Sequence, residues 1–302
     1  MWDTHPPCLA RFARSTLPSE GTAPGPSRLR PVPGAYDWID HGGGVFSKRY
    51  PSLDLNIGVV LCGDGALVVD TRAHHRQARE LLDDLGRITP HPVRWVVNTH
   101  HHWDHTFGNG ALPPVPIWGH ERCAEALRLH GERMRREAQE WFPDHAGLFE
   151  EVVVTPPDRT FSRAVTLTLD DRVVELRYLG RGHTDNDVTV AVPDAGVLFA
   201  GDLIEESSPP FFQDSYPLEW PDTVAALLEM VQGPVVPGHG AVVDRAFVAA
   251  QHQDLAEVAR LAEGRHADGM AADEAAAAGG PYPRDVLEAA FARVWPGLEL
   301  GG

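Results

Sequence analysis

Thr99-His100-His101-His102-Trp103-Asp104-His105 is the stretch that decides the fold and the chemistry of this 302-residue chain. It follows a short apolar run over residues 93–97, which predicts a buried strand, so the histidines stand at a strand end. Alternate side chains of an extended backbone point the same way, so His100 and His102 can bind one metal ion while His101 faces away. A turn after them could bring Asp104 and His105 to a second ion. Imidazole and carboxylate ligands suit Zn²⁺, Mn²⁺ or Fe²⁺.

Three later segments each place a metal-ligand type beside glycine, which lets the backbone turn sharply and approach an ion closely. They are Gly180-Arg-Gly-His183-Thr184, Phe199-Ala-Gly201-Asp202 and Val236-Pro-Gly238-His239-Gly240. Together with the first stretch they supply five histidines and two aspartates: His100, His102, Asp104, His105, His183, Asp202 and His239. This number is enough for two ions, with positions left open for water and substrate.

The order H-x-H-x-D-H, G-H-T, G-D and P-G-H-G resembles that of the metallo-β-lactamase-fold hydrolase superfamily, from about Asn56 to Gly240. The strand that ends in Asp70 resembles the first motif of that superfamily. The resemblance implies two sets of ligands joined by a bridging Asp202: His100, His102 and His183 for the first ion, and Asp104, His105 and His239 for the second. It also implies that Asp70 orients the ligand loops by hydrogen bonding, with Thr184 as a weaker candidate for such support.

Two ions about 3.5–4 Å apart share a water molecule and lower its pKa toward neutrality. The resemblance therefore implies a metal-dependent hydrolase, in which a metal-bridging hydroxide attacks an ester, thioester, lactone or lactam carbonyl. We expect two Zn²⁺ ions, with Fe or Mn as alternatives, and we expect Asp104 to act catalytically by orienting the nucleophile's proton. A Ser-His-Asp mechanism is discarded because no G-x-S-x-G motif occurs.

Departures from the zinc β-lactamases indicate a different branch of the superfamily. The commonest subclass has Cys where this chain has Asp202, and usually Lys where it has Glu205. The resemblance thus implies an Asp-bridged dinuclear branch and not a typical Cys-containing β-lactamase. Three alternatives stay open: a mononuclear-iron sulfur dioxygenase on the same fold, a glyoxalase II-like thioesterase, and a non-catalytic metal-binding protein. The thioesterase is disfavoured because a chain with one lysine offers no obvious basic cluster for glutathione.

The charge of the chain restricts its partners. Twenty-six basic residues against 43 acidic ones give a net charge of −17, which is unfavourable for nucleic acid and for anionic membranes. No apolar run of about 18 residues is present. Glu205 and Glu206 beside the predicted bridge favour a small-molecule substrate that is neutral or cationic. Trp103, Phe211, Phe212 and Tyr216 are candidates, with Glu205, for the wall of a substrate pocket, and ordinary core packing is the alternative.

The remaining patterns concern location and organisation. Three widely spaced cysteines and no apolar segment of the signal-peptide kind predict a cytoplasmic protein.

Residues 1–34 are rich in Pro, Ser, Gly and Arg, a composition that predicts a disordered or loosely packed extension. Strands and helices then recur in two similar sets before and after about residue 150, and the chain ends in a helical segment. We predict a single α/β domain over residues 35–302, built as a four-layer αββα sandwich of two mixed sheets with helices on the outer faces.

Overall fold

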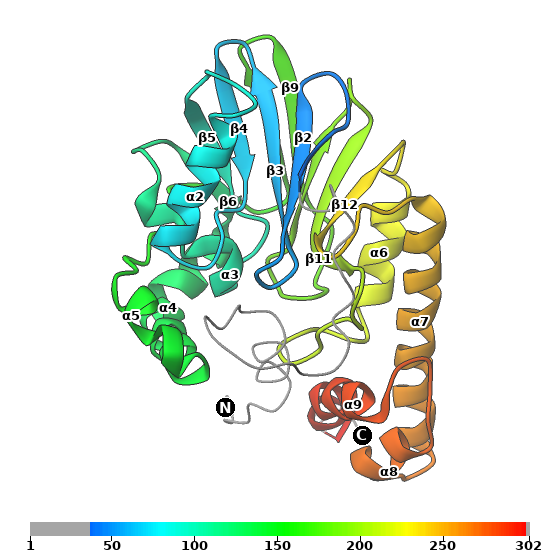
Figure 1. The fold of residues 1–302 in the computed structure, drawn as a ribbon. Coiled ribbons are helices and arrows are strands. Elements are labelled where there is room, and N and C mark those ends of the chain that lie inside the picture. Colours follow the sequence, from blue (N-terminus) through cyan, green and yellow to red (C-terminus); the bar gives the residue numbers. More distant parts are fainter. Residues whose placement is uncertain (1–36, 300–302) are drawn as a thin grey trace, which may run out of the picture.

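The structure of the protein, a computed structural model, describes residues 37–299 (Figure 1). The extension predicted for residues 1–34 lies outside the described residues. The strands are β1 (Trp38–Asp40), β2 (Val45–Tyr50), β3 (Leu55–Cys62), β4 (Gly65–Val69), β5 (Val93–Val97), β6 (Ile117–His120), β7 (Arg159–Phe161), β8 (Ala164–Leu169), β9 (Arg172–Tyr178), β10 (Val188–Val192), β11 (Val197–Glu205) and β12 (Val235–His239).

The helices lie between and after these strands. They are α2 (His75–Leu85), α3 (Trp103–Thr106), α4 (Glu121–Trp141), α5 (Ala146–Glu150), α6 (Trp220–Leu228), α7 (Arg245–Ala267), α8 (Ala272–Ala277) and α9 (Arg284–Glu299), with short 3₁₀ turns η1 (Asn109–Ala111) and η2 (Pro143–His145). Within the described residues, no helix combines the length and the apolar character that a membrane span needs.

All the described strands belong to one hydrogen-bonded sheet, with the order β7-β6-β5-β4-β3-β12-β11-β10-β9-β8 and with β2 and β1 continuing from β3. This mixed sheet with flanking helices confirms the α/β class. The prediction of two sheets differs from the observed pairing in one place. β3 pairs with β4 along residues 58–62 and also meets β12 at the single pair Leu55–His239, which makes the strands continuous.

Three hydrophobic clusters surround this sheet. The first joins β3 and β4 to α2 and α4, and the second joins β11 to α6, α7 and α9. The third contains the alternate residues of the same strands, such as Val60 of β3 and Phe199 of β11, and no helical residue. Because both faces of β3 are covered, its sequence Leu55–Cys62 is apolar almost throughout rather than alternating. Figure 1 shows α2 and α4 on one side of the strands and α6 and α7 on the other.

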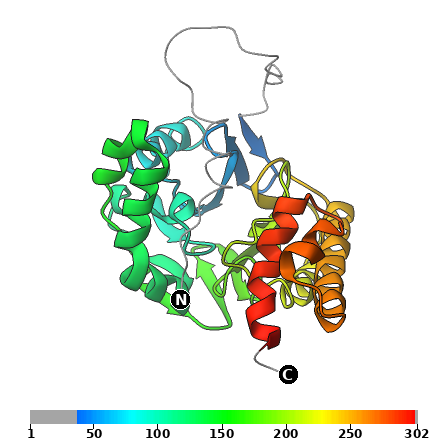
Figure 2. The ribbon, with the colours of Figure 1, turned by 90° about the horizontal axis from the view of Figure 1, so that it is seen from below.

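The strand directions bring the predicted ligand segments to one edge of the sheet. β4 and β5 are parallel, β11 and β12 are parallel, and β12 and β4 both run antiparallel to β3. The carboxyl ends of all four strands therefore point the same way, and ligands of open sheets bind at such ends. In Figure 2, which views the molecule from below, the green helices α4 and α5 and the orange and red helices α7–α9 stand on opposite sides.

Candidate metal centre

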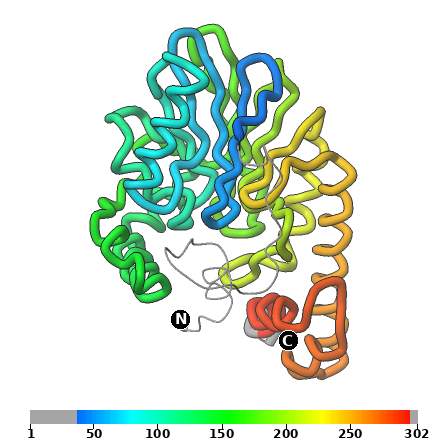
Figure 3. The backbone as a smooth tube through the Cα atoms, in the orientation of Figure 1, coloured from blue at the N-terminus to red at the C-terminus, as the bar shows by residue number. Residues whose placement is uncertain are grey.

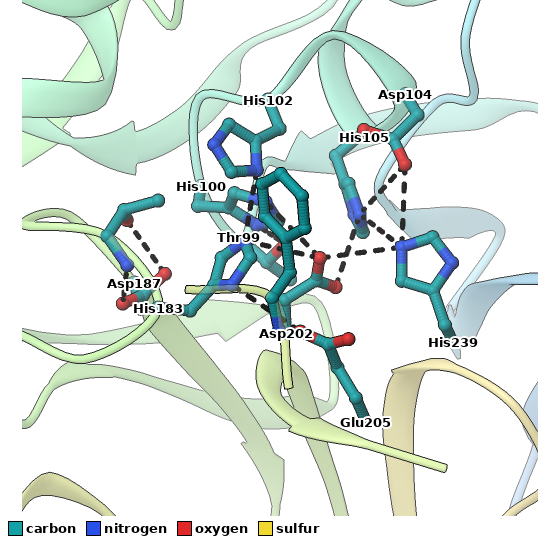
Figure 4. A network of polar contacts seen from close by, with 12 residues as sticks. Thr99, His100, His102, Asp104, His105, His183, Asp187, Asp202, Glu205 and His239 are labelled. Carbon is teal, nitrogen blue, oxygen red and sulfur yellow. Dashed lines mark hydrogen bonds and ion pairs between the residues drawn. The ribbon is translucent and has the colours of Figure 1, made fainter. Parts of the chain in front are cut away.

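The first predicted ligand set meets at the end of β5. One ligand atom from each of His100, His102, His183 and Asp202 lies within 4.8 Å of the others. His183 Nε2 lies 2.9 Å from His102 Nδ1 and 3.4 Å from Asp202 Oδ2, and His100 Nε2 lies 3.7 Å from the same oxygen. Figure 4 shows these side chains facing one another. His101 is outside this group, and its Nδ1 contacts the amide of Asn186.

The second set, Asp104, His105 and His239, forms an adjoining cluster. His105 Nε2 and His239 Nε2 are 3.4 Å apart, and Asp104 Oδ2 lies 3.7 and 3.4 Å from them respectively. Asp202 reaches this cluster too, with Oδ1 3.3 Å from His105 Nε2 and Oδ2 3.4 Å from His239 Nε2. The carboxylate of Asp202 therefore lies between the two sets, as Figure 4 shows.

The local backbone explains how neighbouring residues serve different clusters. α3 begins immediately after His102, so the chain turns from extended to helical and carries Asp104 and His105 around to the second set. On the other side, Gly201 has φ +54° and the pairing of β11 with β12 shifts register there. A Cβ at Gly238 would lie 1.7 Å from Asp202 Oδ1. Glycine at 238 is therefore required for the carboxylate of Asp202 to occupy its position.

Four of the five histidines hold their outward nitrogen against a fixed partner. These contacts are His105 Nδ1 with Asp70 Oδ2 (2.8 Å), His239 Nδ1 with Leu53 O (2.8 Å), His102 Nε2 with Asp214 Oδ2 (3.0 Å) and His100 Nδ1 with Thr99 Oγ1 (3.1 Å). A neutral imidazole carries one N–H, so an acceptor on the outer nitrogen leaves a lone pair on the inner one. The inner nitrogens converge on the cluster.

The residues fit a bound metal. His100 Nε2 is buried and has no hydrogen-bond partner among the described residues, which is unusual for a buried polar atom. Two pairs of imidazole nitrogens also face each other, His102 with His183 and His105 with His239. A divalent cation would satisfy these nitrogens together with the carboxylates, and the set of nitrogen and oxygen donors suits Zn²⁺, Mn²⁺ or Fe²⁺.

Burial and charge act in opposite directions on these histidines. Burial lowers the pKa of His183 to about 3 and holds the pKa of His100 well below its usual value, so both imidazoles are neutral. Burial also opposes protonation of His105 and His239, but the carboxylate of Asp202 with that of Asp104 outweighs it and raises both pKa values well above 6.5. The carboxylates of Asp202 and Asp104 therefore favour positive charge at the second set, which a cation would supply.

Asp70 and Thr184, which the resemblance implies as supporting residues, both make hydrogen bonds next to the candidate ligands. Asp70 accepts hydrogen bonds from both the backbone N–H and the hydroxyl of Thr99 in addition to its contact with His105. Thr184 donates through its N–H and its hydroxyl to Asp187, a residue that sequence reasoning did not single out. Burial raises the pKa of Asp187 to about 7. Thr184 thus braces the loop after His183.

The two predicted carboxylates beside the bridge differ from each other. Glu205 is buried, accepts a hydrogen bond from the N–H of Phe211 and lies 3.5 Å from His183 Nδ1. Burial, with the charge of Asp202, raises the pKa of Glu205 to about 8, so it is largely neutral at pH 7. Glu206 turns elsewhere and accepts from the N–H of Ala241. Glu205 therefore adds less negative charge to the centre than its sequence position suggests.

The four candidate pocket aromatics occupy different surroundings. The ring of Phe211 is half-buried, 6.4 Å from the ring of His102 and 6.2 Å from that of His183. Trp103 and Phe212 belong to the first and second hydrophobic clusters, a position that favours the core-packing alternative for both. Tyr216 lies under the guanidinium of Arg181, 4.6 Å from its carbon. Of these four rings, that of Phe211 is the one that pairs with imidazole rings of candidate ligands among the described residues.

Asp214 contacts the candidate ligand His102 and was not predicted from the sequence. It lies 112 residues after His102, in the segment between β11 and α6, and no glycine or histidine motif accompanies it. The only signal is an acidic residue within an aromatic, proline-rich stretch, which is equally typical of a surface loop. Its proximity to His102 depends on the tertiary fold.

The amino-acid sequence is similar to those of known proteins. Residues 54–239 match the sequence pattern of the metallo-beta-lactamase superfamily, which is more than half of the chain. The metallo-beta-lactamase type 2 of Bacillus cereus is 26% identical over 219 residues, covering 70% of this chain and 76% of that protein.

Two solved structures show the same fold. The metallo-beta-lactamase from Pontibacter korlensis aligns with a TM-score of 0.57 and 23% identity, over 73% of this chain and 98% of its own. The stereoselective inverting sec-alkylsulfatase Pisa1 from Pseudomonas sp. aligns with a TM-score of 0.70 and 18% identity, over 85% of this chain and 50% of its own.

Proposed function

Because this chain belongs to the metallo-β-lactamase superfamily, we propose that it is a metal-dependent hydrolase whose centre is the cluster of histidines and aspartates at the end of β5. Its substrate carries an ester, thioester, lactone or lactam carbonyl. The observation that carries the proposal is the position of Asp202, whose carboxylate oxygens lie within 3.7 Å of an imidazole nitrogen from each of four histidines. An ion pair that only stabilises the fold would need one histidine beside Asp202, and not four.

Two Zn²⁺ ions, with Fe or Mn as alternatives, are the proposed cofactors. His100, His102 and His183 would hold one ion, and Asp104, His105 and His239 the other, with Asp202 shared between them. Bound divalent ions would lower the pKa of a coordinated water and polarise the carbonyl of the substrate. The complete set of donor residues supports this proposal over a non-catalytic metal-binding protein.

Asp104 is the proposed catalytic residue of the chain itself. Burial opposes its ionisation, but His105 and His239 hold the pKa of its carboxyl below its usual value. Asp104 is therefore ionised at neutral pH, and Oδ2 would accept a hydrogen bond from the attacking water and hold its proton. Asp70 and Leu53 O keep the rings of His105 and His239 fixed during this step.

The substrate is proposed to be a small molecule, neutral or cationic, without nucleic acid or membrane as a partner. The net charge of −17 supports this preference. Glu205 supports it less than its sequence position implied, because burial keeps that carboxyl largely protonated. The half-buried ring of Phe211 beside His102 and His183 supports an apolar group next to the scissile carbonyl.

Two further proposals concern architecture and location. The continuous sheet is proposed to fold into two facing halves, giving the four layers αββα, because three separate hydrophobic clusters alternate with the strands. A single domain over residues 35–302 stays a prediction. A cytoplasmic location is proposed because Cys62 and Cys123 are both buried free thiols.

The test combines metal analysis with a substrate screen. The purified chain is reconstituted with Zn²⁺, Mn²⁺ or Fe²⁺, dialysed, and assayed on lactam, lactone, thioester, carboxylic ester, phosphodiester and secondary alkyl sulfate substrates. We expect two equivalents of zinc and hydrolysis of one carbonyl class, both lost in Asp202→Ala. Less than one equivalent of any metal would contradict the dinuclear centre. One stable equivalent of iron with oxygen consumption on a thiol substrate would instead establish the sulfur dioxygenase.

A further inference from the structure

The segment between β11 and α6 carries Asp214 to the outer side of the candidate metal centre. Asp214 Oδ2 lies 3.0 Å from His102 Nε2, and the side chains of both residues are 14–16% exposed. On its other side this segment is held by the last helix. Arg293 of α9 donates from Nε to Ser215 O at 3.0 Å, and its second guanidinium nitrogen lies 3.4 Å from Asp214 O. In Figure 3 the yellow-green segment lies next to the red helix α9.

The two ring nitrogens of His102 have different partners. Nδ1 faces the cluster, 2.9 Å from His183 Nε2, while Nε2 faces Asp214. A carboxylate only accepts, so it requires a hydrogen on Nε2 and leaves the Nδ1 lone pair for a metal. Without the carboxylate, the ring would be free to place its hydrogen on Nδ1 or to rotate, and either change removes one ligand.

A third ion held by His101, His102 and Asp214 is the competing explanation, since one ligand atom from each lies within 4.8 Å of the others. The contacts favour orientation of His102 instead. His101 Nδ1 faces the amide of Asn186, and its Nε2 is 3.8 Å from Asp214 Oδ2, against 3.0 Å for His102. A ligand shared with a third ion would also withdraw His102 Nε2 from the carboxylate.

We propose that Asp214 is a positioning residue for His102, and that Arg293 of α9 holds Asp214 in place. The inference rests on the proposed metal centre and adds to it. α9 lies outside residues 54–239, which carry the family pattern, so a helix beyond that pattern takes part in building the metal centre. α9 is thereby more than an external support.

The test measures zinc affinity and one spectroscopic signal in the full chain. Zinc affinity comes from competition with a chromophoric chelator, for wild type, Asp214→Ala, Asp214→Asn, Arg293→Met and the control Asp222→Asn, an exposed carboxylate on α6. Imidazole N–H protons are observed by NMR in zinc-loaded protein labelled with ¹⁵N-histidine.

Removal of a residue that orients a ligating histidine costs about 10–100-fold in metal affinity. We expect Asp214→Ala to lose zinc affinity by that factor at one of the two ions. The same variant should also lose one protected downfield N–H signal. Asp214→Asn retains an acceptor oxygen and should keep the signal with less than a tenfold loss. Arg293→Met should lower the affinity for the same ion by a smaller factor, and Asp222→Asn should match wild type.

Three outcomes separate the explanations. Unchanged zinc affinity and N–H signals in both Asp214 variants, with wild type binding two ions, would overturn the positioning role and leave the proposed function intact. Wild type without zinc binding would overturn both. Three equivalents in wild type and two of unchanged affinity in Asp214→Ala would make Asp214 a ligand of a third ion. If circular dichroism shows that Asp214→Ala is unfolded, Asp214→Asn and Arg293→Met decide the result by the same readouts.

Discussion

Asp70 Oδ2 lies 2.8 Å from His105 Nδ1, although the two residues are 35 positions apart and follow different strands. Asp70 has φ +64°, a left-handed conformation that is uncommon for a residue other than glycine. Both carboxylate oxygens also accept from Thr99, so the side chain is held in place from two directions. The strained backbone at the end of β4 thus serves to aim one imidazole at the centre.

Replacing Asp70 with Ala should weaken the binding of the ion at His105 more than that of the ion at His100, which Asp70 reaches only through Thr99. The change frees His105 Nδ1 from its acceptor, and loss of such a partner costs about 10–100-fold in metal affinity. Chelator competition with zinc measures both affinities. Asp83→Asn, an exposed position on α2, is the control. Equal weakening of both ions, with a lower free energy of unfolding in chelator, would show that Asp70 supports the fold and not His105 alone.

Gly238→Ala should abolish metal binding, because the surrounding atoms leave little space for the new methyl group. The new Cβ would meet Asp202 Oδ1 at 1.7 Å and the Asp202 backbone N at 3.0 Å, so the carboxylate of Asp202 has to move. Gly264→Ala is the matched change in an open position, since a Cβ there meets nothing within 4 Å in the last turn of α7. It should bind zinc normally and gain at most about 1 kcal/mol in free energy of unfolding. Retention of both zinc ions in Gly238→Ala would show that the Asp202 carboxylate is not held as described.

Phe211→Ala should raise KM without loss of metal. The ring of Phe211 lies beside the candidate ligands His102 and His183 and is half-buried, so truncation removes apolar surface next to the substrate. Full burial of such a side chain contributes about 1.5–3 kcal/mol. Half of that contribution corresponds to a rise in KM of roughly 4- to 13-fold. The measurement compares p-nitrophenyl acetate with the butyrate, with Phe211→Leu as the conservative variant. An equal fall in kcat for both esters at unchanged KM would remove Phe211 from the pocket.

Much of this arrangement could be predicted from the sequence because it depends on local patterns. The strand before His100, the turn that separates Asp104 from His102, and glycines beside Asp202 and His239 are all visible in short windows. The order of these motifs along the chain then predicted that they meet. The α/β class follows from the same alternation of apolar runs and amphipathic helices.

The parts that were not predictable depend on contacts distant in sequence. No motif marks Asp214, since its partner His102 is 112 residues away. The environment of Glu205 was unpredictable for the same reason, because its burial beneath the segment of Phe211 is a tertiary property. The joining of two expected sheets into one depends on the single pair of Leu55 with His239, which no periodicity reveals.

His74→Asn should reduce the loss of stability in mild acid. His74 precedes α2 and its Nδ1 accepts a hydrogen bond from the N–H of Gln77, which requires the neutral ring. Burial, with the nearby charge of Arg72, lowers its pKa to about 4 from 6.5. The unfolded chain therefore binds a proton between pH 6.5 and 4 that the folded chain does not. The contribution of His74 to stability is complete above pH 6.5 and falls as the pH drops toward 4.

The size and sign of this effect can be measured by urea unfolding in chelator, so that titration of the metal-site histidines cancels between wild type and variant. Between pH 7.5 and pH 5, the contribution of His74 changes only over the 1.5 pH units from 6.5 to 5. Over that interval wild type should lose roughly 2 kcal/mol in free energy of unfolding that the variant keeps. Asn retains a capping acceptor without titrating, so the stability of His74→Asn relative to wild type should rise by that amount as the pH falls. His91→Asn, at a partly exposed position, is the control. A stability difference between His74→Asn and wild type that stays constant from pH 7.5 to pH 5 would show that His74 does not titrate differently in the folded and unfolded chain.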